Sequence, residues 1–225
     1  MPGIKNELVE TLWFGKDPFT AFPDGLFQAD AQGWNENHPY LREGIDDLRP
    51  KIVVEVGVWK GSSSIVMAKR MKDLRIDGAV IAVDTWLGAV DHWAHENWFS
   101  SLVVEHGQPM LMRTFMTNVV KSEVSDYIVP LPLDSINAAE LLKLRQVQVD
   151  MVHIDAGHEY ESVISDLKAW WPLVRPGGLL VGDDYYDNDR DWPGLKRAFH
   201  EFFSNAGIEC PLENTSAKCR VRKPI

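Results

Sequence analysis

The chain has 225 residues, of which 45% are hydrophobic and 25% charged, and this suits one globular domain with a modest extension. Its formal net charge of -10 at pH 7 argues against a nucleic-acid partner, because proteins that bind DNA or RNA present basic surfaces. Two cysteines are too few for a disulfide framework, and the sequence shows neither a signal-peptide core nor an apolar stretch that could span a bilayer. We therefore expect a reduced, cytoplasmic location and no membrane partner.

The first fifty residues differ in character from the rest of the chain. Residues 1–50 are rich in aromatic side chains and interrupted by proline and glycine, so we expect an irregular extension. One helix is predicted over Leu41–Leu48, and Pro50 ends it. A separate α/β domain is predicted over residues 51–225.

From Lys51 onward, strand and helix signals alternate. Strands are predicted at Ile52–Val58, Val80–Asp84, Tyr127–Leu133, Asp150–Asp155 and Leu179–Asp183, with a weaker pair near Ile208–Leu212 and Cys219–Arg222. Helices are predicted at Ser63–Met71, Ile136–Leu144, Tyr160–Leu173 and Gly194–Asn205. Alternation of this kind predicts a parallel sheet with helices on both faces. Ligands of such sheets bind beyond the carboxyl ends of the strands.

The most informative motif follows the first of these strands. An apolar run ends in Glu55, and Gly57 and Gly61 then frame a turn that opens a helix. Trp59 occupies the place that the middle glycine of a pyrophosphate-binding turn would take. An acid at Glu55 repels phosphate and can pair with an ammonium group, which favours S-adenosylmethionine as the cofactor. The alternative is a buried turn with an incidental glutamate.

Two further strand ends carry polar residues that suit a nucleoside. Asp84 ends the second strand, where an acid can bind a ribose diol, and the alternative is an acid that caps a loop. Asp134 and Ser135 follow the third strand, where they could reach an adenine edge. Capping of the helix that begins near Ile136 explains this pair equally well.

Acidic residues gather at the last two strand ends. Asp155 ends the fourth strand, Asp183 and Asp184 end the fifth, and neighbouring strands would bring all three together. Three adjacent carboxylates repel one another, and a hard divalent ion, with Mg²⁺ as the expected one, would relieve this. His158 lies three residues after Asp155 and could act as a general base above the ion. The alternative is a solvated acidic loop with a surface histidine.

A long segment, Trp86–Thr114, interrupts the alternation and is rich in tryptophan and histidine. Segments of this length without strong secondary-structure signals are often lids or binding loops. We therefore expect it to form a mobile cover over the acceptor. Trp59, Trp86 and Trp93 lie near the predicted ligand edge, where aromatic faces suit the apolar sides of sugars, although core packing is their commoner use.

Four segments together resemble the class I S-adenosylmethionine-dependent methyltransferases, and in particular small bacterial sugar O-methyltransferases of the macrocin and mycinamicin type: Glu55–Ser64, Val83–Gly88, Val152–Tyr160 and Pro176–Tyr185. The resemblance implies a Rossmann-like, doubly wound, seven-stranded and mostly parallel sheet with an antiparallel C-terminal hairpin. It also implies that residues 1–50 are an extension on the substrate side and that residues 51–225 form the methyltransferase domain.

The resemblance further implies the residue roles. In similar enzymes the positions of Asp155, Asp183 and Asp184 hold magnesium, and the position of His158 is the catalytic histidine, so Asp155 and His158 are the expected catalytic residues. The first of the paired acids is often Glu in that family and is Asp183 here, one methylene shorter. The expected cofactor contacts are Glu55, Gly57, Trp59, Gly61, Ser62, Asp84, Thr85, Trp86, Asp134 and Ser135.

The expected reaction is therefore methyl transfer from S-adenosylmethionine to a hydroxyl of a sugar or a glycosylated natural product, assisted by a divalent cation. A catechol-type enzyme with a planar phenolic acceptor remains an alternative. A non-catalytic domain that binds the cofactor or a partner protein is another. The sequence fixes neither the small-molecule acceptor nor the oligomeric state, and a homo-oligomer is compatible with it.

Overall fold

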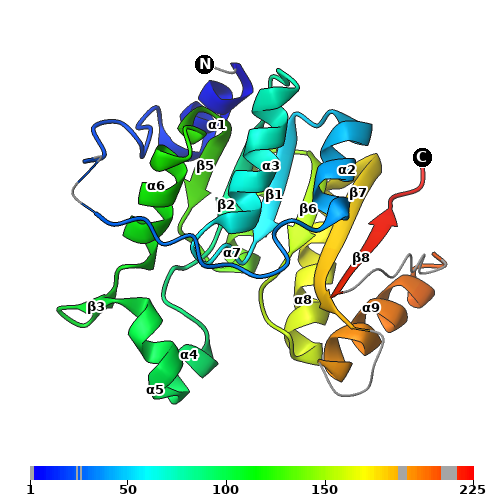
Figure 1. Cartoon of the computed structure of the whole chain (residues 1–225). Coiled ribbons are helices and arrows are strands. Elements are labelled where there is room, and N and C mark those ends of the chain that lie inside the picture. The colour runs from blue at the N-terminus through cyan, green and yellow to red at the C-terminus, as the bar shows by residue number, and fades with distance from the viewer. Residues whose placement is uncertain (1–2, 24, 26, 187–191, 209–216) are drawn as a thin grey trace.

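A computed structural model describes residues 3–23, 25, 27–186, 192–208 and 217–225 (Figure 1). The strands are β1 Ile52–Val56, β2 Ala79–Val83, β3 Val104–Glu105, β4 Gln108–Pro109, β5 Ile128–Leu131, β6 Val149–Ile154, β7 Val174–Tyr185 and β8 Ala217–Arg222. The α-helices are α1 Gly3–Trp13, α2 Pro39–Leu48, α3 Ser62–Asp73, α4 Val90–Ala94, α5 Glu96–Phe99, α6 Leu111–Lys121, α7 Ser135–Leu144, α8 Tyr160–Trp170 and α9 Pro193–Asn205. Short 3-10 turns cover Ser100–Leu102, Ser125–Tyr127 and Trp171–Leu173.

The central sheet has the strand order β5-β2-β1-β6-β7-β8. The first five strands run parallel, and β8 pairs antiparallel with β7. This arrangement confirms the predicted Rossmann-like fold with its antiparallel C-terminal strand. The described residues supply six of the seven predicted strands, since the segment expected near Ile208–Leu212 lies almost wholly outside them.

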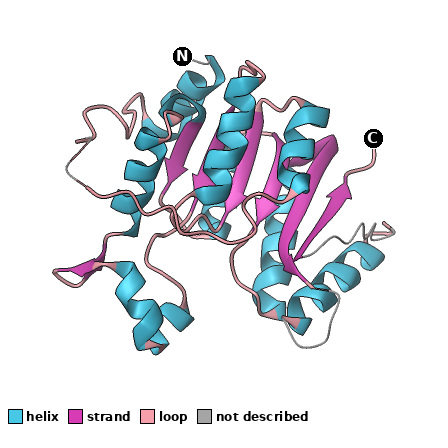
Figure 2. Cartoon of the chain, viewed as in Figure 1, coloured by secondary structure: helices cyan, strands magenta, loops and turns pink. Residues whose placement is uncertain are grey.

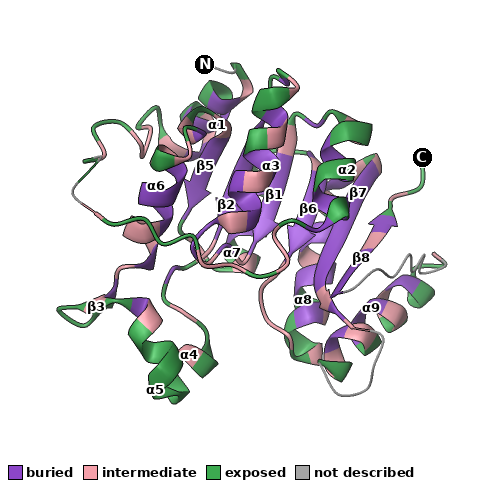
Figure 3. Cartoon of the chain, in the orientation of Figure 1, coloured by how far each residue is buried: buried purple, intermediate pink, exposed green. Residues whose placement is uncertain are grey.

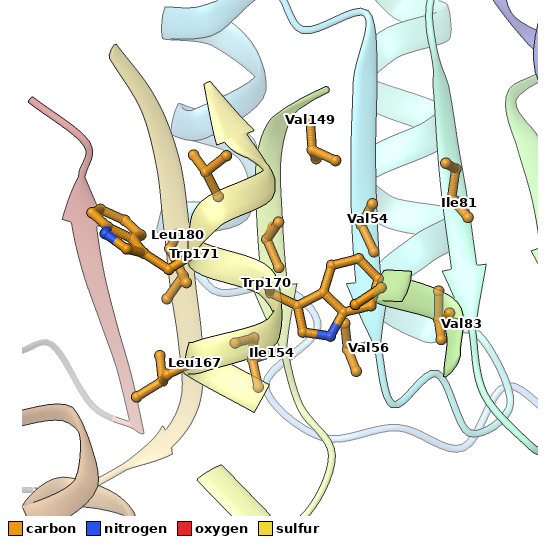
Figure 4. Packing of buried hydrophobic residues seen from close by; sticks show 14 of the residues in the cluster. Val54, Val56, Ile81, Val83, Val149, Ile154, Leu167, Trp170, Trp171 and Leu180 are labelled. Carbon is orange, nitrogen blue, oxygen red and sulfur yellow. The ribbon is translucent and has the colours of Figure 1, made fainter. Parts of the chain in front are cut away.

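Helices cover both faces of the sheet, as the alternation of elements predicts (Figure 2). Helices α2, α3 and α6 pack on one face, where Val53, Val80 and Val181 contribute to the buried cluster. Helices α1, α7, α8 and α9 pack on the other face. There Trp170 of α8 shares a cluster with Val54 and Val56 of β1 (Figure 4). Because both faces of the sheet are buried, the sequences of the parallel strands consist mostly of apolar residues.

The N-terminal region is more ordered than the sequence indicates. Residues Gly3–Trp13 form α1, whose buried face includes Leu8, Val9 and Leu12, and the Trp13 indole donates to the carbonyl of Pro130 at 2.8 Å. The apolar spacing of this segment is helical, but no side chain that favours an N-cap marks its start. After α2, residues 49–51 lead into the central strand β1.

The segment that follows β2 forms an arm at the carboxyl end of the sheet. Its α4, α5 and the β3–β4 hairpin extend from the body and are mostly exposed (Figure 3). Trp93, Trp98 and Phe99 are among its exposed aromatic side chains. The predicted long insertion is therefore present, and it contains short helices and a hairpin where the sequence gives only weak signals. Among the described helices, none is long and apolar enough to cross a bilayer.

Candidate active site

A cavity of about 810 Å³ lies at the carboxyl edge of the sheet. Its walls come from the residues that follow β1, β2, β5, β6 and β7, from the N-terminal segment 32–35, and from the arm. This is where the strand order of an open α/β sheet places a ligand. Most of the sequence-predicted site residues line this cavity, and the exceptions are Gly61 and Trp86.

The glycine turn after β1 is held against the neighbouring strands. Gly57 has φ +84°, and a Cβ built there would lie 1.9 Å from the backbone oxygen of Asp155. Gly61 has φ +93°, and its Cβ would lie 2.6 Å from the Phe115 ring. Both positions require glycine because of their backbone conformation and the atoms packed against them. Gly57 therefore allows close packing on β6, whereas Gly61 makes room for Phe115 of α6.

The N-terminal segment is fixed across the start of α3. The Ser62 hydroxyl donates to the carbonyl of Ala31 at 3.1 Å, and a Cβ on Gly33 would lie 2.5 Å from the Ser62 Cβ. The buried Lys60 ammonium pairs with Asp30 at 2.5 Å. Ser62 thus lines the cavity and also anchors the segment that forms one of its walls.

Asp84 stabilises the glycine turn. Its Oδ2 accepts hydrogen bonds from the backbone N–H groups of Val58 at 2.8 Å and Trp59 at 2.9 Å, and its Oδ1 accepts from that of Trp86 at 2.7 Å. Burial raises the pKa of this carboxyl, although the three N–H donors oppose the shift. The loop-capping alternative therefore has direct geometric support, and a ribose would have to share the same carboxylate.

The tryptophans of this region divide into two groups. Trp86 is buried, packs on Phe115 with ring centroids 4.9 Å apart, and donates its indole N–H to the Trp59 carbonyl at 2.9 Å. Trp59 has φ +54°, lines the cavity and stacks on His92 of the arm at 4.3 Å. The exposed Thr85 also faces the cavity. Trp86 thus belongs to the packing beneath the site.

Asp134 has the capping role that the sequence allows, and the adjacent Ser135 is hydrogen-bonded within the fold. Asp134 caps α7, because its side chain accepts from the backbone N–H of Ile136 at 3.1 Å. The Ser135 hydroxyl bonds to Asp166 and accepts the indole N–H of Trp170 at 2.9 Å. Both residues line the cavity, so capping is compatible with the predicted contact to an adenine edge, which stays a prediction.

Glu55 is nearly fully buried and already has two partners. Its Oε2 is hydrogen-bonded to the Ser64 hydroxyl, and its Oε1 lies 3.0 Å from Nδ1 of His153, which is on the neighbouring strand β6. Burial raises the pKa of Glu55 to about 8 and lowers that of His153 to about 3. A ligand amine would therefore compete with Ser64 and His153 for this carboxyl group.

The two aspartates at the end of β7 lie in a β-bulge. The register between β7 and β8 runs from Gly182 opposite Cys219 to Tyr185 opposite Ala217, so two residues face one. Bulges of this kind redirect side chains beside active sites. Asp184 has φ +52°, and its carboxylate lies 2.7 Å from Nε2 of His158.

The adjacent Asp183 has different partners from Asp184. It is buried and forms an ion pair with Lys218, and its Oδ1 accepts from the backbone N–H of Asp184 at 2.8 Å. The side-chain amide of Asn35 also contacts Oδ1, at 3.3 Å. The bulge thus separates the environments of the two consecutive carboxylates.

Asp155, His158 and Asp184 come together, as the sequence predicts for residues at the ends of β6 and β7. Each offers one ligand atom, and these atoms all lie within 4.8 Å of one another. Desolvation, together with the nearby Asp183, raises the pKa of Asp155 well above its usual range. The two carboxylates suit a divalent cation, and the imidazole beside them suits a general base. Asp183, the third predicted ligand, is not part of this group among the described residues.

The family assignment follows from a comparison with known proteins. A family model described as a methyltransferase domain matches residues 54–185, which include the glycine turn, Asp155, His158 and both aspartates of the bulge. The chain belongs to this methyltransferase family. The family predicted from the sequence is thereby confirmed.

Individual proteins resemble this methyltransferase at low identity. The uncharacterized protein y4gI of Sinorhizobium fredii is 22% identical over 151 residues, which make up 67% of this chain but only 15% of y4gI. The O-methyltransferase NovP shares 18% identity with coverage of 98% of both chains and a TM-score of 0.61. The O-methyltransferase TomG of Streptomyces achromogenes, solved with S-adenosylmethionine, shares 14% identity over 93% of this chain and 80% of TomG, with a TM-score of 0.55. These structures share the fold of this methyltransferase.

Several residues of the site carry no signal in the sequence. Lys218 and Asn35 contact Asp183, and Trp34 and Trp192 line the cavity. Trp192 stacks on His158 with ring centroids 4.3 Å apart. Trp34 lies in a Gly-Trp-Asn sequence that resembles a loop, and nothing in its local pattern indicates that this loop crosses the end of the sheet.

Proposed function

We propose that this chain is an S-adenosylmethionine-dependent O-methyltransferase that acts on a hydroxyl of a sugar or a glycosylated natural product, with a divalent cation, expected to be Mg²⁺, at the site. The observation that carries this proposal is the convergence of Asp155, His158 and Asp184 in the same cavity as the glycine turn. Transfer to a hydroxyl requires removal of a proton, and His158 would supply the base beside two carboxylates that suit a cation.

The charge of the cavity supports a cofactor without phosphate. Its described lining includes seven carboxylate residues and neither lysine nor arginine: Glu55, Asp84, Asp91, Asp134, Asp155, Asp183 and Asp184. Burial raises the pKa of Glu55, Asp84 and Asp155, but the described lining offers no lysine or arginine to bind phosphate. A pyrophosphate is therefore disfavoured relative to a sulfonium group. The charge distribution therefore favours S-adenosylmethionine over a nicotinamide dinucleotide.

The aromatic part of the cavity supports a glycosidic acceptor. Trp34, Trp98 and Trp192 line the cavity and remain 51%, 39% and 38% exposed, so their surfaces are available to a ligand. Aromatic faces of this kind pack well on the apolar sides of a sugar ring. The carboxylates that disfavour pyrophosphate also disfavour a nucleotide-linked sugar. An uncharged or amine-bearing glycoside fits both features.

The site residues can position the acceptor and receive its proton. His158 is held by the 2.7 Å contact between its Nε2 and Asp184 and by stacking on Trp192. In this arrangement Nε2–H donates to Asp184, and Nδ1 accepts the hydroxyl proton. Asp155 and Asp184 would hold the cation. When bound, the cation favours ionisation of the acceptor hydroxyl, and the cofactor supplies the methyl group. Alignment of the reacting groups supplies much of the rate.

A methyl-transfer assay with labelled S-adenosylmethionine tests this proposal. The acceptors are p-nitrophenyl rhamnoside as a neutral glycoside, dTDP-rhamnose and catechol. We expect transfer to the neutral glycoside, loss of activity with chelator and recovery with Mg²⁺. His158→Ala should lower turnover by about 10²- to 10⁴-fold, the usual range for loss of a positioned base. His95→Ala, at another cavity-lining histidine, is the matched control and should have a much smaller effect.

Three results would contradict parts of this proposal. Transfer to catechol alone would indicate a phenolic O-methyltransferase. Binding of the cofactor without transfer to any acceptor would favour a non-catalytic domain. Full turnover in excess chelator would remove the cation from the mechanism, and a His158→Ala enzyme close to wild type would remove the base.

A further inference from the structure

A buried lysine lies next to the acidic edge of the site. The Lys218 side chain of β8 is 0% exposed, although lysine is seldom fully buried unless it is paired. Its ammonium group donates to Oδ2 of Asp183 and lies 3.1 Å from Nε2 of His153. Asp183 of β7 and His153 of β6 thus hold the ammonium group of Lys218 in place. The mechanism proposed above does not use it.

The hydrogen bonds around Lys218 fix the direction of each donor. Lys218 carries only N–H donors, so Nε2 of His153 must accept from it. In a neutral imidazole the other nitrogen then carries the proton, and Nδ1–H donates to Oε1 of Glu55 at 3.0 Å. The result is a continuous chain from Asp183 through Lys218 and His153 to Glu55, which crosses β7, β8, β6 and β1. The donor and acceptor roles of each side chain in this chain of hydrogen bonds are therefore set by its neighbour.

The bulge makes Lys218 the single residue opposite Asp183 and Asp184. Gly182 faces Cys219 and Tyr185 faces Ala217, so only residue 218 lies between these pairs on β8. The carboxylate of Asp183 contacts Lys218, whereas that of Asp184 contacts His158. The side chains at the candidate cation site, whose ligand atoms lie within 4.8 Å of one another, are accordingly Asp155, His158 and Asp184. Asp183 is not among them.

We infer that Lys218 is a positioning residue of the candidate cation site: its ammonium group keeps Asp183 out of the ligand set and leaves a divalent ion to Asp155 and Asp184. This inference rests on the proposed function, in which a cation occupies that site. Lys218 also adds a positive charge near the ion. Both effects weaken cation binding, since one carboxylate is withheld and like charges repel. The lysine thereby sets the affinity of the site.

Equilibrium binding of Mn²⁺ to the full chain, measured from the electron paramagnetic resonance signal of the free ion, tests this role without any acceptor. Lys218→Met removes the ammonium group and releases Asp183, so we expect at least tenfold tighter binding than in wild type. The double variant Asp183→Asn with Lys218→Met removes one negative and one positive charge together. It should bind Mn²⁺ within about threefold of wild type, because neither residue is a ligand.

The double variant also keeps the experiment informative if the single variant Lys218→Met fails to fold. Lys218→Met leaves a buried carboxylate without its partner, and breaking a buried ion pair in this way is strongly destabilising. The double variant leaves no such charge. Calorimetric titration with S-adenosylhomocysteine checks that every variant retains its cofactor site. Failure of wild type to bind S-adenosylhomocysteine would count against the proposed function, independently of the cation result.

Loss of Mn²⁺ binding by more than tenfold in the double variant would show that Asp183 is a ligand and would overturn the inference. Unchanged affinity in a folded Lys218→Met variant would also overturn it. Cation binding by Lys218→Met where wild type shows none would support it. The absence of binding in every variant would refute both this role of Lys218 and the cation in the proposed mechanism, while methyl transfer is judged by its own assay.

Discussion

Replacement of Asp84 by alanine should destabilise the protein even when no ligand is bound. The substitution leaves three backbone N–H groups, of Val58, Trp59 and Trp86, without the carboxylate that accepts their hydrogen bonds. Hydrogen bonds to a charged group contribute about 1.5–3 kcal/mol each. The three share one acceptor and are coupled, so we expect a total loss of about 3–5 kcal/mol. For a domain of this size, that lowers the melting temperature by roughly 6–20 °C.

Thermal unfolding of the ligand-free protein, followed by circular dichroism, measures this effect. Asp134→Ala is the matched control, because it removes an N-cap carboxylate from the same cavity and should cost about 1 kcal/mol. S-adenosylhomocysteine should also bind more weakly to Asp84→Ala, since the turn is no longer held. If the variant unfolded within about 1 kcal/mol of wild type and lost only cofactor affinity, Asp84 would be a ribose ligand and would not support the turn.

Three further substitutions test other parts of the site. Gly57→Ala places a Cβ against the Asp155 backbone at φ +84°, so we expect loss of folding or of cofactor binding; a wild-type melting temperature would contradict the assigned packing role. Burial raises the pKa of Glu55 from 4.5 to about 8, so the native state keeps a proton that the unfolded chain releases, and the contribution of this group to the free energy of unfolding should fall as pH rises from about 4.5 to about 8. Glu55→Gln should flatten this dependence in urea titrations, and an unchanged slope would refute the assignment. Trp98→Ala on the arm should raise the acceptor KM at least tenfold with little change in cofactor affinity, whereas equal losses would indicate a structural role.

The glycine turn and the strand positions were predictable because their signals are local. The run that ends at Glu55 and the spacing of Gly57 and Gly61 are visible without any knowledge of tertiary structure. The position of Asp155 and Asp184 at the ends of parallel strands also followed, since neighbouring strands bring their carboxyl ends together. These features depend only on the backbone and on strand order.

The role of Asp84 and the burial of Lys218 were not predictable in the same way. An acid at the end of β2 is compatible with a ribose or with backbone N–H groups, and only the folded turn shows where those groups point. Lys218 alternates with apolar residues in the same way as Arg222 does, but Arg222 is exposed. Residues 35–38 lie beside Ala217 at this end of β8, and the sequence contains no local signal of that contact.

The position of Lys218 on β8 has a consequence for the order in which the site assembles. Asp183 and its ammonium partner are 35 residues apart, and β8 follows the five parallel strands in the chain, so it emerges after them during synthesis. The five parallel strands can associate before it, but Asp183 then has no buried cation beside it. A nascent chain in this state must keep that carboxyl group hydrated or protonated. The carboxyl edge of the sheet therefore reaches its final charge balance only when β8 pairs with β7.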